Sequence, residues 1–156
     1  MERDAPLKTS GNTILVTGGG SGIGEALAHR FHDLGNTVII AGRRLGALDR
    51  SRVGRANMHA LTLDVDSAEG VADFARRVLA AHPTLNILIN NAGIMRFEQL
   101  DRSRDLSDAE ETVGTNLLGP IRLKTEVVQG AMPEWGYTMA RSGYAYYRIS
   151  VTTPFL

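Results

Sequence analysis

The 156-residue sequence contains no cysteine, so a disulfide framework, a thiolate nucleophile and a cysteine-based metal site are all excluded. It has no excess charge either: 17 basic and 17 acidic residues balance, which argues against a nucleic-acid binder held by bulk charge. Apolar runs stay well short of the roughly 20 residues of a membrane span, and the polar segment 1–12 shows no secretory signal. We therefore expect a cytoplasmic protein of about one domain, with no membrane or nucleic-acid partner.

What the sequence does contain is a repeated alternation of buried strands and amphipathic helices. Short β-branched and apolar runs predict four strands, at 13–17, 37–41, 59–64 and 87–89. Apolar residues at helical spacing between them predict helices that begin near Ile23, Leu45 and Ser67, and Ser67 is the expected N-cap. Such repeated βαβ units predict an α/β fold, a Rossmann-like doubly wound parallel sheet with strand order 3-2-1-4.

A last helix is expected from Asp108 to about Gln129, after which the character of the chain changes. One face of this helix is apolar and carries Val113, Leu117, Ile121 and Val128. All four tyrosines and the only tryptophan follow residue 130, and no strand–helix alternation continues there. We therefore divide the chain into a polar extension (1–10), a Rossmann-like domain (11–130) and an atypical tail (131–156).

A glycine-rich segment, Thr17-Gly-Gly-Gly-Ser-Gly-Ile-Gly24, lies between the first predicted strand and the first predicted helix. Phosphate groups need backbone N–H donors at close range, which a Cβ would block, and they gain from the positive N-terminus of a helix. Gly18 would allow the tight exit from the strand, Gly22 the approach of a diphosphate, and Gly24 the packing of helix on sheet. A flexible turn is the alternative, whereas a P-loop is disfavoured because no Gly-Lys-Ser/Thr follows.

Four motifs together resemble the short-chain dehydrogenase/reductase family over about residues 11 to 128. They are Thr17-Gly-x-x-x-Gly-x-Gly24, Asp64 after the third strand, Asn90-Asn-Ala-Gly93 after the fourth, and Asn116 in the last helix. The resemblance implies NAD(P)-dependent oxidoreduction, in which a hydride passes between a nicotinamide cofactor and a small carbonyl or alcohol substrate. A non-catalytic NAD(P)-binding or interaction module is the main alternative. A methyltransferase is a further one, which would leave the 90–93 segment unexplained.

The resemblance also implies roles at the carboxyl ends of the strands, where ligands bind in doubly wound sheets. Asp64, with Val65 beside it, matches the family residue that contacts the adenine amino group, and an N-cap is its alternative role. The 90–93 segment matches the loop that lines the adenosine ribose. The expected cofactor-binding residues are Thr17, Gly18, Ser21, Gly22, Ile23, Gly24, Arg43, Arg44, Asp64, Val65, Asn90, Ala92 and Gly93.

Arg43 and Arg44 follow the second predicted strand, at a place where an acidic residue would bind a ribose hydroxyl and favour NAD. No acidic residue stands there, and two guanidinium groups suit a ribose phosphate instead. We therefore expect NADP to be preferred over NAD, with Arg43 the stronger candidate. A pair of solvated arginines at the start of a helix is the alternative.

Asn116 is the one residue expected in a catalytic role. Pro120 has no N–H, so the Asn116 carbonyl loses its usual helical partner and is free to hold a water. The resemblance implies that use, because the family's catalytic Asn holds a relay water through its main chain; a packing kink is the alternative. His29 and His32 lie three residues apart without accompanying carboxylates, so no metal site is expected.

The other residues of the family's catalytic set have no match in this sequence. No Tyr-x-x-x-Lys occurs, and Tyr137–Arg141 and Tyr144–Arg148 carry arginine in place of the lysine. We expect a chain truncated after the fourth strand and the following helix and catalytically impaired, with a tail that comes from a shifted reading frame or an aberrant end. Truncation would leave the 87–89 strand as an apolar sheet edge. The family usually assembles through this helix and the next, so we expect a marginally stable, self-associating chain or a homo-oligomer.

Overall fold

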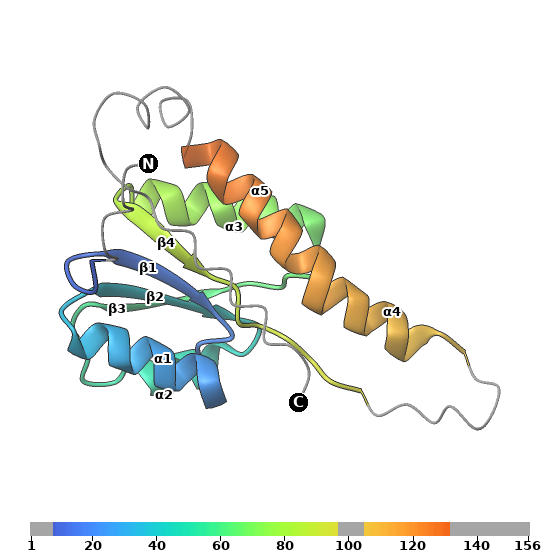
Figure 1. Cartoon of the computed structure of the whole chain (residues 1–156), viewed down its shortest axis with the longest axis horizontal. Helices are drawn as coiled ribbons and strands as arrows, with labels where there is room; N and C mark the ends of the chain where they lie inside the picture. The colour runs from blue at the N-terminus through green and yellow to red at the C-terminus, as the bar shows by residue number, and fades with distance from the viewer. Residues whose placement is uncertain (1–7, 97–104, 132–156) are drawn as a thin grey trace, which may run out of the picture.

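The computed structural model describes residues 8–96 and 105–131 (Figure 1). The four tyrosines, Trp135 and the rest of the predicted tail beyond Ala131 lie outside the described residues, and so does the N-terminal segment 1–7. The described residues include the glycine-rich segment and every residue predicted for the cofactor or for catalysis.

Four parallel strands form one sheet in the order β3-β2-β1-β4, which confirms the predicted topology. The strands are β1 (Thr13–Thr17), β2 (Thr37–Gly42), β3 (Met58–Thr62) and β4 (Leu85–Ile89). The first two agree closely with their predicted ranges. β3 ends at Thr62 instead of residue 64, and β4 begins at Leu85 instead of residue 87.

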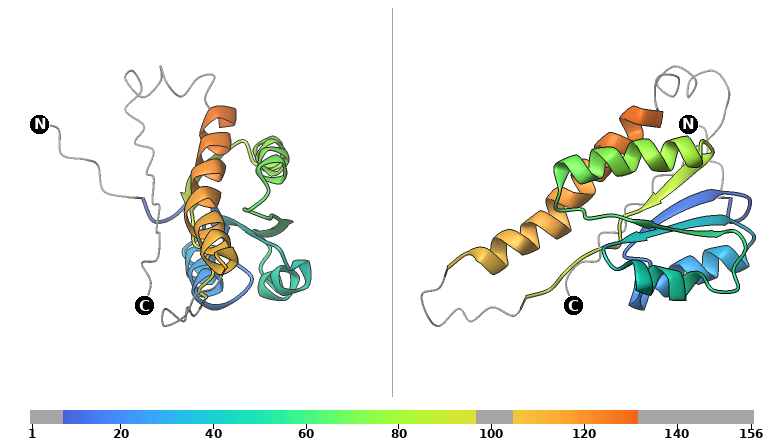
Figure 2. Two further views of the ribbon diagram at one scale, coloured as in Figure 1. Left: turned by 90° about the vertical axis from the view of Figure 1, so that its right-hand side faces the viewer. Right: turned by 180° about the vertical axis from the view of Figure 1, so that it is seen from behind.

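Helices cover both faces of this sheet. They are α1 (Gly22–Asp33), α2 (Leu45–Arg52), α3 (Ala68–Ala81), α4 (Ser107–Val113), the π-helical η1 (Gly114–Leu118) and α5 (Gly119–Ala131). α1 and α2 lie on one face, and α3 and α5 lie on the other (Figures 1 and 2). The Ser67 hydroxyl accepts a bond from the Gly70 N–H at 3.0 Å, which confirms the predicted N-cap of α3. No helix in the described part of the chain combines the length and the apolarity that a bilayer crossing requires.

Alternate strand residues divide the core into two layers, because successive side chains of a strand point to opposite faces. The layer toward α1 and α2 includes Ile14, Val16, Val38, Ile40, Leu48 and Ile89. The layer toward α3 and α5 includes Leu15, Ile39, Val71, Phe74, Val78 and Leu123. Burial on both faces explains why the two central strands have nearly continuous apolar sequences.

An asparagine network closes the sheet where its strands begin. Asn36 is buried, and its Oδ1 accepts bonds from the Asn12 backbone N–H at 2.9 Å and from Asn12 Nδ2 at 3.1 Å. The Asn36 Nδ2 in turn donates to the Phe31 carbonyl at 2.7 Å. Asn86 donates to Asn12 Oδ1 at 3.1 Å and accepts from the Thr13 N–H at 3.0 Å. The side-chain amides therefore pair backbone groups that would otherwise be buried without partners.

The predicted helix from Asp108 to Gln129 is not a single α-helix, because the π-helical segment η1 joins α4 to α5. The Gly119 N–H donates to the Gly114 carbonyl five residues back, as the wider π-helical pattern requires. Pro120 follows directly and has no N–H to donate. Regular α-helical bonding is therefore already broken at this place, which favours the wider turn.

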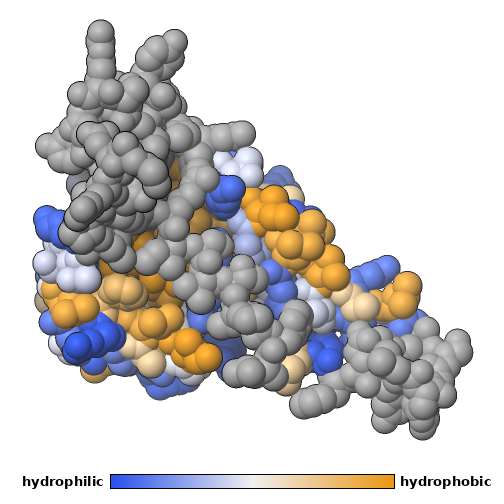
Figure 3. Space-filling model, in the orientation of Figure 1, coloured by the Kyte–Doolittle hydropathy of each residue, from blue (hydrophilic) through white to orange (hydrophobic). Residues whose placement is uncertain are grey.

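The apolar face predicted for this helix is exposed over its described part. Val113, Leu117 and Ile121 are each about half exposed, and Leu118 adds to the same surface. Figure 3 shows apolar surface running along this helix. The side chain of Val128 lies outside the described side chains. The exposed row therefore leaves a helix face without a partner in the described part of the chain.

A different row of side chains packs against the body of the domain. It consists of Thr115, Gly119, Leu123 and Val127, all of which are buried. A Cβ on Gly119 would come within 2.9 Å of the Val65 Cβ. The helix backbone at Gly119 therefore lies directly against the Val65 side chain, in the segment after β3. A small residue is therefore needed at Gly119, whereas Leu123 and Val127, farther along the row, belong to the apolar core layer on the α3 side of the sheet.

Two histidine rings meet between β3 and the end of α3. The centroids of His59 and His82 are 4.7 Å apart, and the ring planes are tilted by 51°. Burial lowers the pKa of His82, and the charge of His59 lowers it further. Protonated His82 is therefore less favoured in the folded chain than in the unfolded chain. The unfolded chain binds more protons as the pH falls through the ordinary histidine value, so folding stability drops there.

We expect the chain to lose stability as the pH is lowered from about 7 to about 5, and the His82→Gln variant to lose less. Thermal unfolding followed by circular dichroism across this range measures both slopes. His32→Gln is the control, because that ring lies 3.3 Å from the Asp33 carboxylate instead of against a second imidazole, and it should not reduce the loss. Equal slopes for the wild type and His82→Gln would contradict the prediction.

Candidate functional site

An open cavity of about 540 Å³ lies at the carboxyl ends of the strands, the edge at which doubly wound sheets bind ligands. The glycine-rich segment, the end of β2, the segments after β3 and β4, and η1 form its walls. The predicted residues that line it are Thr17, Gly18, Ser21, Ile23, Gly24, Arg43, Arg44, Val65, Ala92, Gly93 and Asn116. The fold thus brings together residues that are far apart in the sequence.

Three predicted residues are not in the cavity wall. Gly22 opens α1 beside it, Asn90 is buried, and Asp64 is exposed. The Asp64 Oδ1 accepts a bond from the Asp66 N–H at 3.1 Å, so Asp64 shapes the turn after β3 and leaves the N-cap of α3 to Ser67. The prediction missed other lining residues, which include Gly20, Leu48, Leu63, Asp66, Asn91, Ile94 and Thr115. Of these, Gly20 and Asn91 lie inside the quoted motifs.

The glycine-rich segment turns sharply between β1 and α1. Gly18 and Gly22 have φ angles of +71° and +57°, values that L side chains rarely adopt. A Cβ on Gly24 would lie 2.3 Å from the Gly18 carbonyl oxygen, whereas a Cβ on Gly22 would meet nothing within 4 Å. Gly24 is therefore required for packing, and Gly22 borders open space at the N-terminus of α1. The Ser21 side chain makes no cap bond, so the first-turn N–H groups have no side-chain cap.

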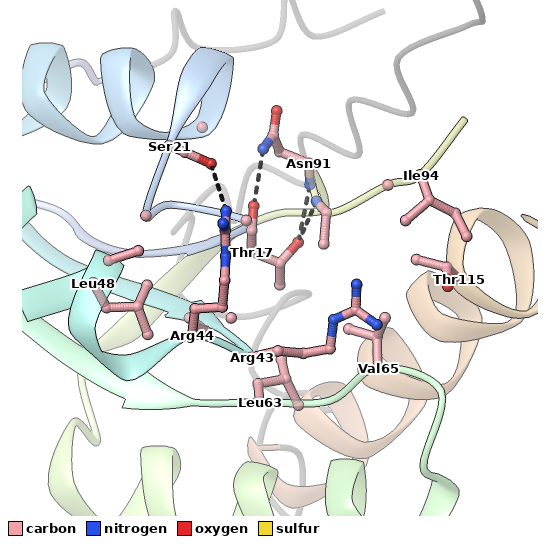
Figure 4. A pocket seen from close by; sticks show the side chains of 18 of the residues that line it. Thr17, Ser21, Arg43, Arg44, Leu48, Leu63, Val65, Asn91, Ile94 and Thr115 are labelled. Atoms are coloured by element: carbon pink, nitrogen blue, oxygen red, sulfur yellow. Dashed lines mark hydrogen bonds between the residues drawn. The ribbon is translucent and has the colours of Figure 1, made fainter. Parts of the chain in front are cut away.

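Thr17 ties the end of β1 to the segment after β4. Its buried Oγ1 accepts bonds from the backbone N–H groups of Asn91 and Ala92, both at 3.0 Å. The Asn91 Nδ2 donates to the Thr17 carbonyl at 3.0 Å, and Figure 4 shows these three bonds together. The result is a fixed edge for the cavity, built from two strands that are neighbours in the sheet but distant in the sequence.

Asn116 holds that same segment with both the oxygen and the nitrogen of its side-chain amide. Its Oδ1 accepts from the Ile94 N–H and its Nδ2 donates to the Ile94 carbonyl, both at 2.8 Å. A Cβ on Gly93 would lie 3.1 Å from the Asn116 Oδ1, so a side chain there would press on the contact. These two bonds fix the orientation of the Asn116 side chain against the segment after β4.

A second tie joins η1 to the segment after β3. The Thr115 hydroxyl lies 2.9 Å from both carboxylate oxygens of Asp66, to which it donates. Arg122 donates to the Asp66 carbonyl at 3.1 Å. Thr115 is buried and Asp66 is exposed, and both residues line the cavity, so this bond forms in its wall. The segments after β3 and β4 are thereby held by neighbouring residues of one helix.

Arg43 and Arg44 give one end of the cavity a positive charge. The Arg44 Nη2 lies 3.4 Å from the Ser21 Oγ, and the Arg43 side chain reaches toward Val65 (Figure 4). Both arginines are exposed, and among the described residues neither forms an ion pair. Two guanidinium groups are therefore available to an anion that enters beside the glycine-rich segment.

A parallel sheet in this order, with a glycine turn at the N-terminus of its first helix, defines a Rossmann-like fold. The family model for short chain dehydrogenases matches residues 12–137. The chain belongs to the short-chain dehydrogenase/reductase family of oxidoreductases, which confirms the resemblance found in its motifs. Members of this family typically bind NAD or NADP.

Individual relatives agree with this assignment. The uncharacterized oxidoreductase DltE of Bacillus subtilis (strain 168) is 32% identical over 149 residues, covering 93% of this chain and 59% of that protein. Sulfoacetaldehyde reductase 2 of Chromohalobacter salexigens is 32% identical over 118 residues, covering 74% of this chain and 47% of that protein. The structure of a citronellol catabolism dehydrogenase (AtuB) of Pseudomonas aeruginosa PAO1 has a TM-score of 0.71 at 32% identity, covering 79% of this chain and 52% of that one. The chain thus spans about half the length of these relatives.

The packing role of Gly24 yields a stability prediction. Gly24→Ala places its Cβ against the Gly18 carbonyl oxygen and within 2.4 Å of the Asn91 Nδ2, so it should destabilise the chain by about 1–3 kcal/mol. Gly46→Ala is the matched control in α2, where a Cβ meets only the tip of Arg50 at 3.7 Å and the change should be neutral or stabilising. Urea unfolding compares the two. If Gly24→Ala and Gly46→Ala have equal free energies of unfolding, the close packing of Gly24 against Gly18 and Asn91 is wrong.

Proposed function

We propose that this domain binds a nicotinamide dinucleotide, with NADP preferred over NAD, as the cofactor-binding part of an oxidoreductase that acts on a small carbonyl or alcohol. The observation that carries the proposal is the open space at Gly22, beside uncapped N–H groups at the N-terminus of α1. A diphosphate gains there from the helix dipole and from backbone donors that no side chain shields. The unit that would do this is the domain over residues 11–130.

The preference for NADP rests on the charge at the end of β2. Arg43 and Arg44 stand where NAD-binding folds of this type place an acidic residue. Neither arginine is committed to a carboxylate in the described part of the chain, so both remain available to a ribose phosphate. The cavity opens between these arginines and the glycine turn, which fits a ligand that carries phosphates at both places.

We assign the remaining predicted residues to the rest of the dinucleotide; Asp64 and Asn90, which are outside the cavity wall, each stand next in sequence to a residue that lines it. We assign Asp64 and Val65, after β3, to the adenine, and Asn90, Ala92 and Gly93, after β4, to the ribose and to the rigidity of that wall. Val65 and Gly93 line the cavity from the segments that follow the two outermost strands, β3 and β4. The bonds of Thr17 and Asn116 hold the segment after β4 in place. These assignments place the nicotinamide near Asn116.

The bound nicotinamide would supply the hydride chemistry, and Asn116 is the residue proposed to act beside it. Its side-chain amide makes two bonds to Ile94, and Pro120 cannot supply the N–H that an α-helix would give to its main-chain carbonyl. That carbonyl is therefore the group we propose to hold a relay water. A relative named for sulfoacetaldehyde reduction supports a carbonyl substrate. Since these 156 residues contain no Tyr-x-x-x-Lys, we propose that they bind the cofactor and are impaired in hydride transfer.

Fluorescence titration with NADPH and NADH tests the proposal. We expect NADPH to bind more tightly, and the Arg43→Ala/Arg44→Ala double variant to lose about tenfold or more of its NADPH affinity while NADH binding changes little. Arg76→Ala is the control, because Arg76 is an exposed arginine of α3 that pairs with Asp73. It should leave both affinities unchanged.

Two outcomes would contradict parts of the proposal. If the folded chain binds neither dinucleotide at millimolar concentration, the cofactor assignment is wrong. If the chain oxidises NADPH with a panel of carbonyl compounds, it is not impaired. A chain that binds NADPH without turnover would support the alternative of a non-catalytic NAD(P)-binding module for these residues.

We also propose that the chain self-associates through the exposed row of Val113, Leu117, Leu118 and Ile121. Contiguous apolar side chains on one side of a helix are a typical contact surface between protein chains. A second copy of the same helix face would cover them, because a two-fold contact places the same patch on both partners.

Sedimentation velocity tests the association. The Leu117→Glu/Ile121→Glu double variant places two charges on the exposed row, so we expect it to shift the chain toward the monomer by tenfold or more in dissociation constant. Arg50→Glu is the control, since it changes the net charge by the same amount at an exposed position of α2, on the other face of the sheet. A wild-type chain that is monomeric at all concentrations would contradict the proposal.

A further inference from the structure

Behind the glycine-rich segment lies a hydrogen-bonded chain of three residues. The Ser51 Oγ, in the last turn of α2, donates to the Gly19 carbonyl at 3.2 Å. The His29 Nε2, in α1, lies 2.8 Å from the Ser51 carbonyl oxygen and 3.2 Å from the Ser51 Oγ. Ser51 is only 3% exposed, and it is not in the cavity wall. Two helices and the glycine turn therefore meet at one buried hydroxyl.

The direction of these bonds follows from the chemistry of the partners. A carbonyl oxygen only accepts, so the His29 Nε2 must carry the proton that it gives to Ser51. The Ser51 hydroxyl gives its own proton to Gly19, and its lone pairs face the same His29 N–H. Ser51 also lies near the C-terminus of α2, where carbonyls lack helical partners, so His29 satisfies one of them. The chain thus runs from His29 through Ser51 to the Gly19 carbonyl.

The Gly19 carbonyl determines where the next N–H points. In a trans peptide the C=O of one residue and the N–H of the next point in opposite directions, and no described peptide is cis. With its carbonyl turned back to Ser51, the Gly19–Gly20 peptide turns the Gly20 N–H away from Ser51 and the last turn of α2. Gly20 itself lines the cavity, and nothing in the described part of the chain accepts from its N–H.

We infer that Ser51, held by His29, is a positioning residue for the dinucleotide, because it orients the Gly19–Gly20 peptide so that the Gly20 N–H faces the bound phosphate. The inference rests on the proposed function. Gly20 packs against the start of α2, since a Cβ there would lie 3.2 Å from the Leu48 backbone nitrogen. Arg44 is the N-cap of that helix. The Gly20 N–H therefore lies toward the arginine end of the cavity, where it would donate to a phosphate. Its loss should lower the affinity for NADPH more than the affinity for NADH.

Affinity measurements on Ser51 variants test the inference. Ser51→Ala removes the hydroxyl and should weaken NADPH binding about three- to tenfold, with a smaller effect on NADH. Ser51→Thr keeps a hydroxyl donor and should restore most of the affinity. At the half-buried His29, His29→Gln keeps an N–H donor of similar reach, so it should bind NADPH more tightly than His29→Leu. The His29 pair answers the question if Ser51→Ala fails to fold.

Thr13→Val is the matched control for a general loss of stability. The Thr13 hydroxyl is also buried, and it pairs with the Thr84 hydroxyl at 2.9 Å at the opposite end of the sheet from the cavity. It should lower the melting temperature and leave both affinities unchanged. If Ser51→Ala lowers the melting temperature like Thr13→Val but keeps its NADPH affinity within twofold of the wild type, Ser51 only stabilises the fold and the inference is wrong.

Hydrogen–deuterium exchange gives a readout that needs no ligand. The Gly18 and Gly19 N–H groups both donate to the Ala41 carbonyl, at 2.7 and 3.4 Å, so their exchange reports the conformation of the turn. We expect faster exchange over residues 17–20 in Ser51→Ala and not in Thr13→Val. Equal exchange in Ser51→Ala and the wild type would overturn the inference. Failure of the wild type to bind either dinucleotide would instead refute the proposed function, and the exchange data would still decide whether Ser51 orients the turn.

Discussion

The buried hydroxyl of Thr17 is the contact on which the candidate site depends. It accepts from two successive N–H groups after β4, while Asn91 returns a bond to the Thr17 carbonyl. Hydrogen bonds in a buried, low-dielectric place reinforce one another. Asn91 also lies where a Cβ on Gly18 or Gly24 would stand, so the glycine turn and the segment after β4 are built against the same side chain. The position of each wall of the cavity therefore depends on the other.

The sheet and the glycine turn were predictable because their physical requirements appear directly in the sequence. Strands buried on both faces need continuous apolar residues, and a sharp turn against a helix needs glycine. The role of Asn91 could not be predicted, because Asn90 and Asn91 are neighbours with identical side chains and the sequence does not show which of them faces Thr17. Only the fold shows that Asn90 is buried while Asn91 bonds to Thr17. Ser51 was missed as well, because its partners lie 22 and 32 positions away in the sequence.

The last helix shows how apolarity and burial can separate. Periodicity gave weight to Val113, Leu117 and Ile121, which are exposed, whereas the packed row includes Thr115 and Gly119. Close approach to the segment after β3 demands small residues, and a polar partner in Asp66 demands a hydroxyl. Neither requirement raises the hydrophobicity of the row. The π-helical stretch was signalled only by Pro120, whose missing N–H disturbs the regular pattern without specifying which pattern replaces it.

Because of the asparagine network, the amino ends of the strands differ chemically from their carboxyl ends. At the amino ends, the amides of Asn12, Asn36 and Asn86 bond to one another and to the main chain. At the carboxyl ends, donors such as the Gly20 N–H and the guanidinium groups of Arg43 and Arg44 remain available to a ligand. At the carboxyl ends, the packing contacts of Gly24 and Thr17 lie beside exposed groups that no contact within the domain requires, such as the Arg43 and Arg44 side chains. Substitutions confined to those exposed side chains can therefore alter which ligand is accepted without loss of the contacts that build the turn.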